Sequence, residues 1–129
     1  MIVVTGRVRI APENRERFVA IATEMCGHSR GEDACGGYRV YADLEQDDRY
    51  IFVEEWADDD ALQRHFAQPH TATFMGALIP LLADPADAVF HTVESSRKLD
   101  RERGLVAVDR AASRATPSTS SPDTRFAGE

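Results

Sequence analysis

The stretch that decides the fold is YIFVEEW, residues 50–56. Successive side chains of a strand point to opposite faces of its sheet. One face therefore receives Tyr50, Phe52 and Trp56, and the other receives Ile51 and Val53. A sheet with one solvated face would instead alternate apolar with polar residues. We therefore expect the chain's own helices to cover one face and a second copy of the chain, related by a two-fold axis, to cover the other.

The rest of the first 95 residues supplies the elements around this strand. Period-two alternation predicts further strands over residues 2–10, 38–44 and 87–94, and the second of these forms a hairpin with residues 50–56. Helical periodicity predicts one helix after the first strand and a second helical region before the last. The order βαββαβ indicates an α+β, ferredoxin-like domain with a four-stranded antiparallel sheet and both helical regions on one face.

Helix-end signals set the expected boundaries. Pro12 and Asn14 are expected to open the first helix, with Asn14 as a possible cap, and that helix should fray near residues 27–31. Asp58 is expected to cap the second helical region, which Pro69 must break or kink. The inward stripes of these helices are predicted to hold Phe18, Ile21, Ala22 and Met25, and then Ala61, Leu62, His65 and Phe66.

Composition restricts the class of protein. The chain has 129 residues and a net charge of −7, which argues against a nucleic-acid partner. It has no signal-peptide pattern, no apolar stretch long enough to span a membrane, and only two cysteines, Cys26 and Cys35, so we expect a soluble, reduced, cytoplasmic protein.

The domain organisation follows from a change in composition near residue 95. We expect one domain over residues 1–95 and a C-terminal tail over residues 96–129 that is partly disordered or contacts a partner subunit. The short apolar piece at residues 104–109 is either a strand that adds to a sheet edge or part of a linker.

The residues best suited to catalysis or binding fall between Glu54 and Phe74. Glu54 and Trp56 share one face at the end of a strand, while His65 and His70 come from the helical region that follows. Together they would form a pocket with a few converging polar groups. Each is also explained by burial alone, since a single tryptophan or histidine on an apolar face is commonly a core residue.

Other kinds of site find less support. His65, His70, His91 and Glu54 have the right ligand types for zinc or iron, but their spacing matches no compact motif, so we expect no metal. Nucleophilic catalysis lacks both a Gly-x-Ser-x-Gly motif and a cysteine beside a credible catalytic histidine in sequence.

These motifs resemble those of the antibiotic biosynthesis monooxygenase family. The resemblance rests on Glu54-x-Trp56, on Ala61-Leu62, and on His65 followed by Pro69-His70. Glu32, Cys35 and Tyr38 match the family's segment before its second strand, although Asp33-Ala34 stands where the family commonly has Pro-Gly. The match covers about residues 2–94 and leaves the tail unexplained.

The resemblance implies a dimeric α+β barrel and, in some members, oxygenation of quinols, anthrones or related polyphenols by O₂ without metal or flavin. We therefore expect a small aromatic substrate, molecular oxygen as co-substrate and no cofactor. The base would be His70 or His65. Arg7 or Tyr38 would donate a hydrogen bond to the substrate anion, and the remaining contacts with the substrate would come from Trp56, Phe74, Phe66 and Glu54.

Two alternatives stay open. One is a non-catalytic dimer that binds a small ligand or fills the same space with its own side chains. The other is a haem-binding or haem-degrading protein, which the family also contains. Such members place an asparagine on the first strand, where this chain reads Thr5-Gly6-Arg7-Val8.

Overall fold

The structure is a computed structural model that describes residues 1–108. Contacts within the chain divide it into two compact units, Met1–Thr92 and a second that begins at Val93. Among the described residues, none of the helices has the length and apolar character that crossing a membrane requires.

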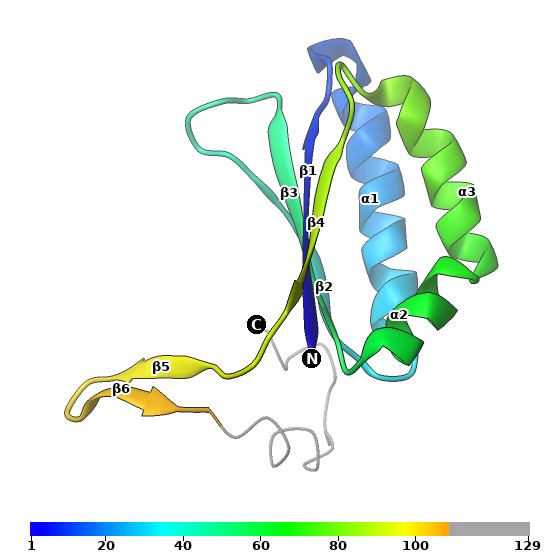
Figure 1. Cartoon of the computed structure of the whole chain (residues 1–129). Helices are drawn as coiled ribbons and strands as arrows, with labels where there is room; N and C mark the ends of the chain where they lie inside the picture. Colours follow the sequence, from blue (N-terminus) through cyan, green and yellow to red (C-terminus); the bar gives the residue numbers. More distant parts are fainter. Residues whose placement is uncertain (109–129) are drawn as a thin grey trace. The chain divides into compact units, whose positions relative to one another are not determined.

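The first unit is built on one antiparallel sheet (Figure 1). Its strands are β1 (Ile2–Arg9), β2 (Cys35–Ala42), β3 (Arg49–Trp56) and β4 (Asp87–Thr92), in the spatial order β2-β3-β1-β4. The expected α+β fold with a four-stranded antiparallel sheet is confirmed. Residues 50–56 lie in the interior of the sheet, paired with β1 on one side and β2 on the other.

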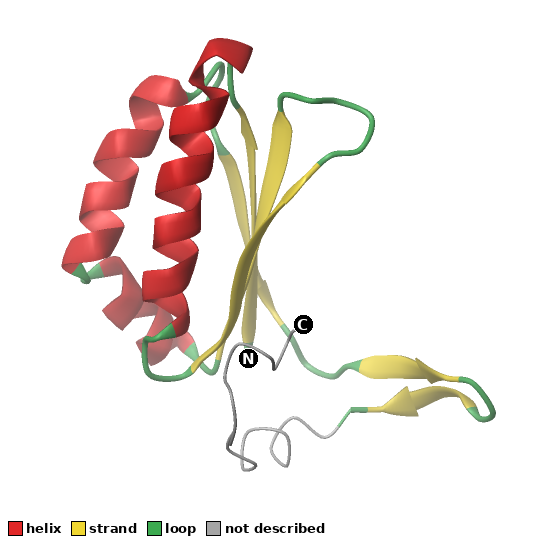
Figure 2. Cartoon of the chain, turned by 180° about the vertical axis from the view of Figure 1, so that it is seen from behind, coloured by secondary structure: helices red, strands yellow, loops and turns green. Residues whose placement is uncertain are grey.

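Three α-helices pack on one side of this sheet (Figure 2). They are α1 (Arg15–Arg30), α2 (Asp59–Phe66) and α3 (Pro69–Leu78), with short 3₁₀ turns η1 (Pro12–Asn14) before α1 and η2 (Ile79–Leu81) after α3. The Asp58 side chain accepts a hydrogen bond from the Ala61 N–H, which confirms the expected cap of α2. Pro69 is the first residue of α3, where its missing N–H costs nothing, so the predicted break falls between two helices.

The limits of α1 correct two predictions. Asn14 stands at the N-cap position of α1, as expected, but its side chain makes no capping hydrogen bond. Its amide instead donates to the Leu81 carbonyl, 3.4 Å away. The helix also continues through Gly27 to Arg30 without fraying there. Met25, Cys26 and Ser29 are buried in this last part, so tertiary packing outweighs the low helix propensity of one glycine.

The core lies between the sheet and the helices. Tyr50, Phe52 and Trp56 are all buried there, as the alternation predicts. Ile51 and Val53 are only half-buried, because no helix covers their face of the sheet. We call this second face the open face. It is formed by the odd-numbered residues of β1 to β4, except Cys35, which precedes a bulge in β2 and packs against the core.

Strands β5 (Arg97–Asp100) and β6 (Gly104–Ala107) form a separate antiparallel hairpin in the second unit. Gly104 adopts a positive φ of 78° at the turn, a conformation that side chains disfavour. The apolar piece after residue 104 therefore forms a strand within its own hairpin, which excludes the linker interpretation for residues 104–107. Its addition to the edge of another sheet stays a prediction. The Thr-, Ser- and Pro-rich end of the predicted tail lies outside the described residues.

Candidate functional site

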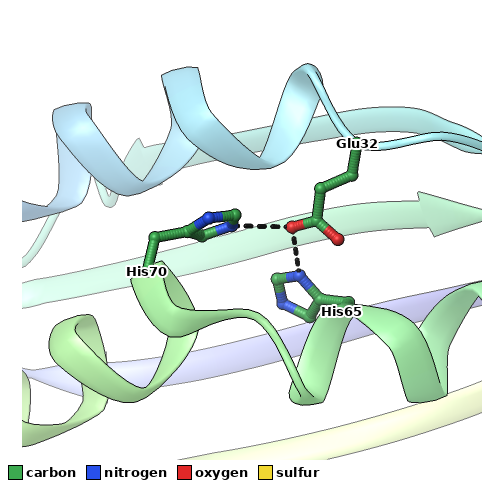
Figure 3. Close-up of side chains that lie close together, drawn as sticks. All are labelled: Glu32, His65 and His70. Atoms are coloured by element: carbon green, nitrogen blue, oxygen red, sulfur yellow. Dashed lines mark hydrogen bonds and ion pairs between the residues drawn. The ribbon is translucent and has the colours of Figure 1, made fainter.

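Two histidines converge on one carboxylate at the end of the helical layer. Glu32 lies in the loop between α1 and β2, His65 near the end of α2, and His70 in the first turn of α3. A single oxygen of Glu32 lies 2.8 Å from Nδ1 of His65 and 2.7 Å from Nε2 of His70 (Figure 3). The helix break at Pro69 brings the two histidines to this shared partner. We call Glu32, His65 and His70 the Glu-His-His cluster.

The cluster becomes more exposed from His65 toward His70. The side chain of His65 is 3 % exposed, that of Glu32 9 % and that of His70 21 %. An ionised carboxylate can only accept hydrogen bonds, so each ring nitrogen that faces it carries the proton. With both rings neutral, the free lone pairs then lie on Nε2 of His65 and Nδ1 of His70. Glu32 thus fixes both tautomers.

Aromatic rings surround the buried histidine. The His65 ring lies 4.5 Å from the Trp56 ring and 5.6 Å from the Tyr38 ring, measured between centroids. Trp56 and Tyr38 are themselves buried, and both come from the strands beneath α2. His65 therefore packs against two buried aromatic rings, which we call the aromatic floor.

A second carboxylate lies in the core beside this floor. Glu54 accepts a hydrogen bond from the Trp56 indole N–H at 2.9 Å. Burial raises the pKa of Glu54, although the Trp56 hydrogen bond and the charge of nearby His65 oppose the rise. Burial, and then the Glu54 carboxyl, raise the pKa of Tyr38 in turn. Tyr38 therefore stays a neutral phenol that can donate a hydrogen bond at physiological pH.

Neither cysteine is equipped as a nucleophile. Burial raises the pKa of Cys26 to about 11 and that of Cys35 to about 12, and both thiols are free. At neutral pH both side chains remain thiols, which are poor nucleophiles.

The structure brings together five of the predicted site residues: Tyr38, Glu54, Trp56, His65 and His70. Of the other three, Phe66 borders the cluster through a ring contact with His65, while Phe74 and Arg7 lie apart from it.

Phe74 and Phe66 take different positions. Phe74 is buried and packs on Phe52, with 5.7 Å between ring centroids. Phe66 is 50 % exposed, which corrects its predicted place on the inner stripe of α2. Its ring contacts Phe90 of the edge strand β4, and Phe90 is itself 49 % exposed. The two partly exposed rings, one from α2 and one from β4, therefore form an accessible aromatic pair next to His65.

Arg7 lies on the open face. It helps to line a hollow of about 420 Å³ at the other end of the sheet, together with Arg9, Arg49 and Tyr50. None of the cluster residues lines this hollow. Of the two predicted hydrogen-bond donors, Tyr38 is thus beside the cluster and Arg7 is not.

Sequence reasoning missed two participants. Glu32 was noted only as part of the family resemblance, since it is 33 and 38 residues away from its two partners. Phe90 could have been found, because strand alternation places it on the helix-facing side of β4, paired with Val4. The possible metal ligands also differ from those read from the sequence. Glu32, and not Glu54, lies with His65 and His70, while His91 lies near Thr5 on the open face.

Comparisons with known proteins identify the family and the fold. The family model for antibiotic biosynthesis monooxygenases matches residues 1–77. The uncharacterised protein sll1783 of Synechocystis is 32 % identical over 98 residues, which cover 76 % of this chain and 67 % of that one. The "Putative monooxygenase YcnE" of Bacillus subtilis is 29 % identical over 69 % of this chain and 94 % of its own.

Solved structures share the fold. Rv0793 from Mycobacterium tuberculosis superposes with a TM-score of 0.68 at 23 % identity, over 71 % of this chain and 93 % of that one. A crystal structure of an antibiotic biosynthesis monooxygenase gives a TM-score of 0.69 at 24 % identity, over 72 % and 98 % of the two chains. The chain belongs to the antibiotic biosynthesis monooxygenase family.

Proposed function

We propose that the chain is a monooxygenase that oxidises a quinol, an anthrone or a related polyphenol with O₂, using neither a metal nor a flavin. The observation that carries the proposal is the Glu-His-His cluster, in which one carboxylate orients two imidazoles. Family membership supports the monooxygenase class. The cluster supports a base as the group that starts the reaction.

The first step is proton abstraction. An imidazole with a fixed tautomer takes the phenolic proton of the substrate, and the Glu32 carboxylate stabilises the imidazolium that forms. His70 is the more exposed ring, so we assign it the first contact with substrate. His65 lies behind it, hydrogen-bonded to the same carboxylate oxygen, and can act as a second acceptor for the abstracted proton.

The second step adds oxygen to the electron-rich anion. In an anthrone, two C–H bonds of the methylene carbon break, one oxygen atom of O₂ enters the new C=O bond, and the other leaves as water. The substrate supplies all four electrons, so no outside reductant is needed. The exposed rings of Phe66 and Phe90 offer an aromatic surface on which the substrate can stack.

The second copy that we expect on the open face belongs to the same proposal. Ile51 and Val53 are half-buried there, and Val89 of β4 is 40 % exposed. Pairing two such faces would cover this apolar surface. Both thiols are free, which suits a reducing compartment, so we place the reaction in the cytoplasm.

Oxygen uptake by chelator-treated protein tests the proposal, with a panel of anthrones and quinols as substrates. We expect uptake above the rate of autoxidation and a loss of about a hundredfold or more in His70→Ala or His65→Ala, the usual contribution of a general base. His91→Ala is the matched control, because it removes an exposed imidazole on the open face. Uptake equal to the buffer blank on every substrate would contradict the proposal.

One observation favours a non-catalytic alternative. His65 is 2 % exposed as a residue, and Trp56 and Phe74 are themselves buried core residues. A module that binds an aromatic ligand through Phe66 and Phe90 alone would show saturable binding of the same panel without oxygen uptake. In that case Phe66→Ala would weaken binding while His70→Ala would not.

A further inference from the structure

We propose that the Glu-His-His cluster is also a binding site for one Zn²⁺ ion per chain. Each of the three residues offers one ligand atom, and all three atoms lie within 4.8 Å of one another. The inference rests on this geometry and does not depend on the proposed oxygenase activity.

The donor set suits zinc. Two imidazole nitrogens and one carboxylate oxygen are a common set of three protein ligands for Zn²⁺, with further positions left to water or a substrate. The side chains of Glu32 and His65 are nearly buried, and that of His70 is partly exposed. A cation would therefore enter from the His70 side and be held where few water molecules compete for the ligands.

The existing distances are close to those of a loaded site. Zinc–ligand bonds of about 2.1 Å place the ligands of a tetrahedral site about 3.4 Å apart. The Glu32 oxygen now lies 2.8 Å and 2.7 Å from the two nitrogens. A cation would thus need the cluster to open by about 0.6 Å. Glu32 lies in a loop and His70 lies in the first turn of a helix, so rotation of these two side chains can supply that opening.

Zinc and the base function exclude each other. The ion would bind Nδ1 of His65 and Nε2 of His70, the two nitrogens that now face Glu32. Each neutral ring would then carry its proton on the other nitrogen, where the lone pair for proton abstraction was. A loaded cluster would therefore be inactive as a base, a consequence that, unlike the metal site itself, rests on the proposed function.

Calorimetric titration of the chelator-treated, untagged chain with Zn²⁺ tests the site, and visible absorption on adding Co²⁺ reports its coordination. We expect one ion per chain, and affinity lowered more than about tenfold in both Glu32→Gln and His70→Ala. His91→Ala and His28→Ala are controls. His91 lies on the open face, and His28 stacks on His70 with 5.2 Å between ring centroids but is not among the three ligands.

Circular dichroism establishes that each variant is folded before it is titrated. Absence of binding in the wild type would overturn the site, and so would equal affinity in the wild type and in folded Glu32→Gln and His70→Ala. Neither titration uses a substrate, so the result is separate from the oxygenase assay. A chain that binds Zn²⁺ but consumes no oxygen would keep the metal site and reject only the proposed function.

Discussion

The two faces of the sheet use the same four strands for different purposes. On the covered face, Trp56 is 1 % exposed and the polar Glu54 is bonded to its indole N–H. On the open face, apolar residues such as Val53 and Val89 alternate across the sheet with Thr5 and Arg39. The covered face is a fully packed core. The open face mixes apolar and polar side chains, as surfaces that contact another protein commonly do.

This difference separates the two proposed functions of the fold. Every residue of the Glu-His-His cluster belongs to the helical layer or to its loops, so the proposed chemistry lies on the covered side. The open face carries no member of the cluster, which leaves it available for assembly. A substitution on one face should therefore disturb one property and spare the other.

The largest expected effect is on the covered face. Trp56→Ala should lower the free energy of unfolding by about 3–5 kcal/mol, because it removes a fully buried ring and leaves a cavity beside His65. Urea denaturation measures this loss. The matched change on the open face is Val89→Ala, which should cost less than about 1 kcal/mol, since Val89 is 40 % exposed. Similar losses for the two variants would contradict the distinction between the faces.

The next effect concerns assembly. Val53→Asp places a charge at the centre of the open face and should weaken self-association more than about a hundredfold, because a buried unpaired charge is costly. Analytical ultracentrifugation over a range of concentrations measures it. Val19→Asp is the control, since it adds the same charge at a 43 % exposed position of α1. A monomeric wild type, or a dimer that tolerates Val53→Asp, would remove the assembly role of the open face.

Much of the fold was predictable because its signals are local. The alternation in residues 50–56 and the Asp58 cap each depend on a few neighbouring residues, and both are confirmed. Asn14 occupies the predicted N-cap position of α1, but its side chain bonds to Leu81, 67 residues away, and caps no helix N–H. Proximity of Glu32 to the two histidines depends on how the loop after α1 folds back over the start of α3. No short-range pattern encodes such a contact, so the candidate site was predicted only in part.

The smallest effect is a pH dependence that comes from the covered face alone. Burial raises the pKa of Glu54 above its ordinary value of 4.5. Between that value and the raised one, the folded chain holds a proton that the unfolded chain has released, so this group makes stability fall as pH rises. Glu54→Gln cannot titrate and still accepts the Trp56 hydrogen bond. Its stability relative to the wild type should therefore increase from about pH 4 to about pH 7.

Urea denaturation of both proteins across this range measures the difference. Glu45→Gln is the control, because Glu45 is an exposed residue of the turn between β2 and β3 and its substitution should leave the pH dependence as it is in the wild type. A Glu54→Gln advantage that stays flat or shrinks with pH would mean that the Trp56 indole and the charge of His65 outweigh burial. The surroundings of Glu54 would then stabilise a charged carboxylate as well as the open face does. The two faces would in that case differ only in packing.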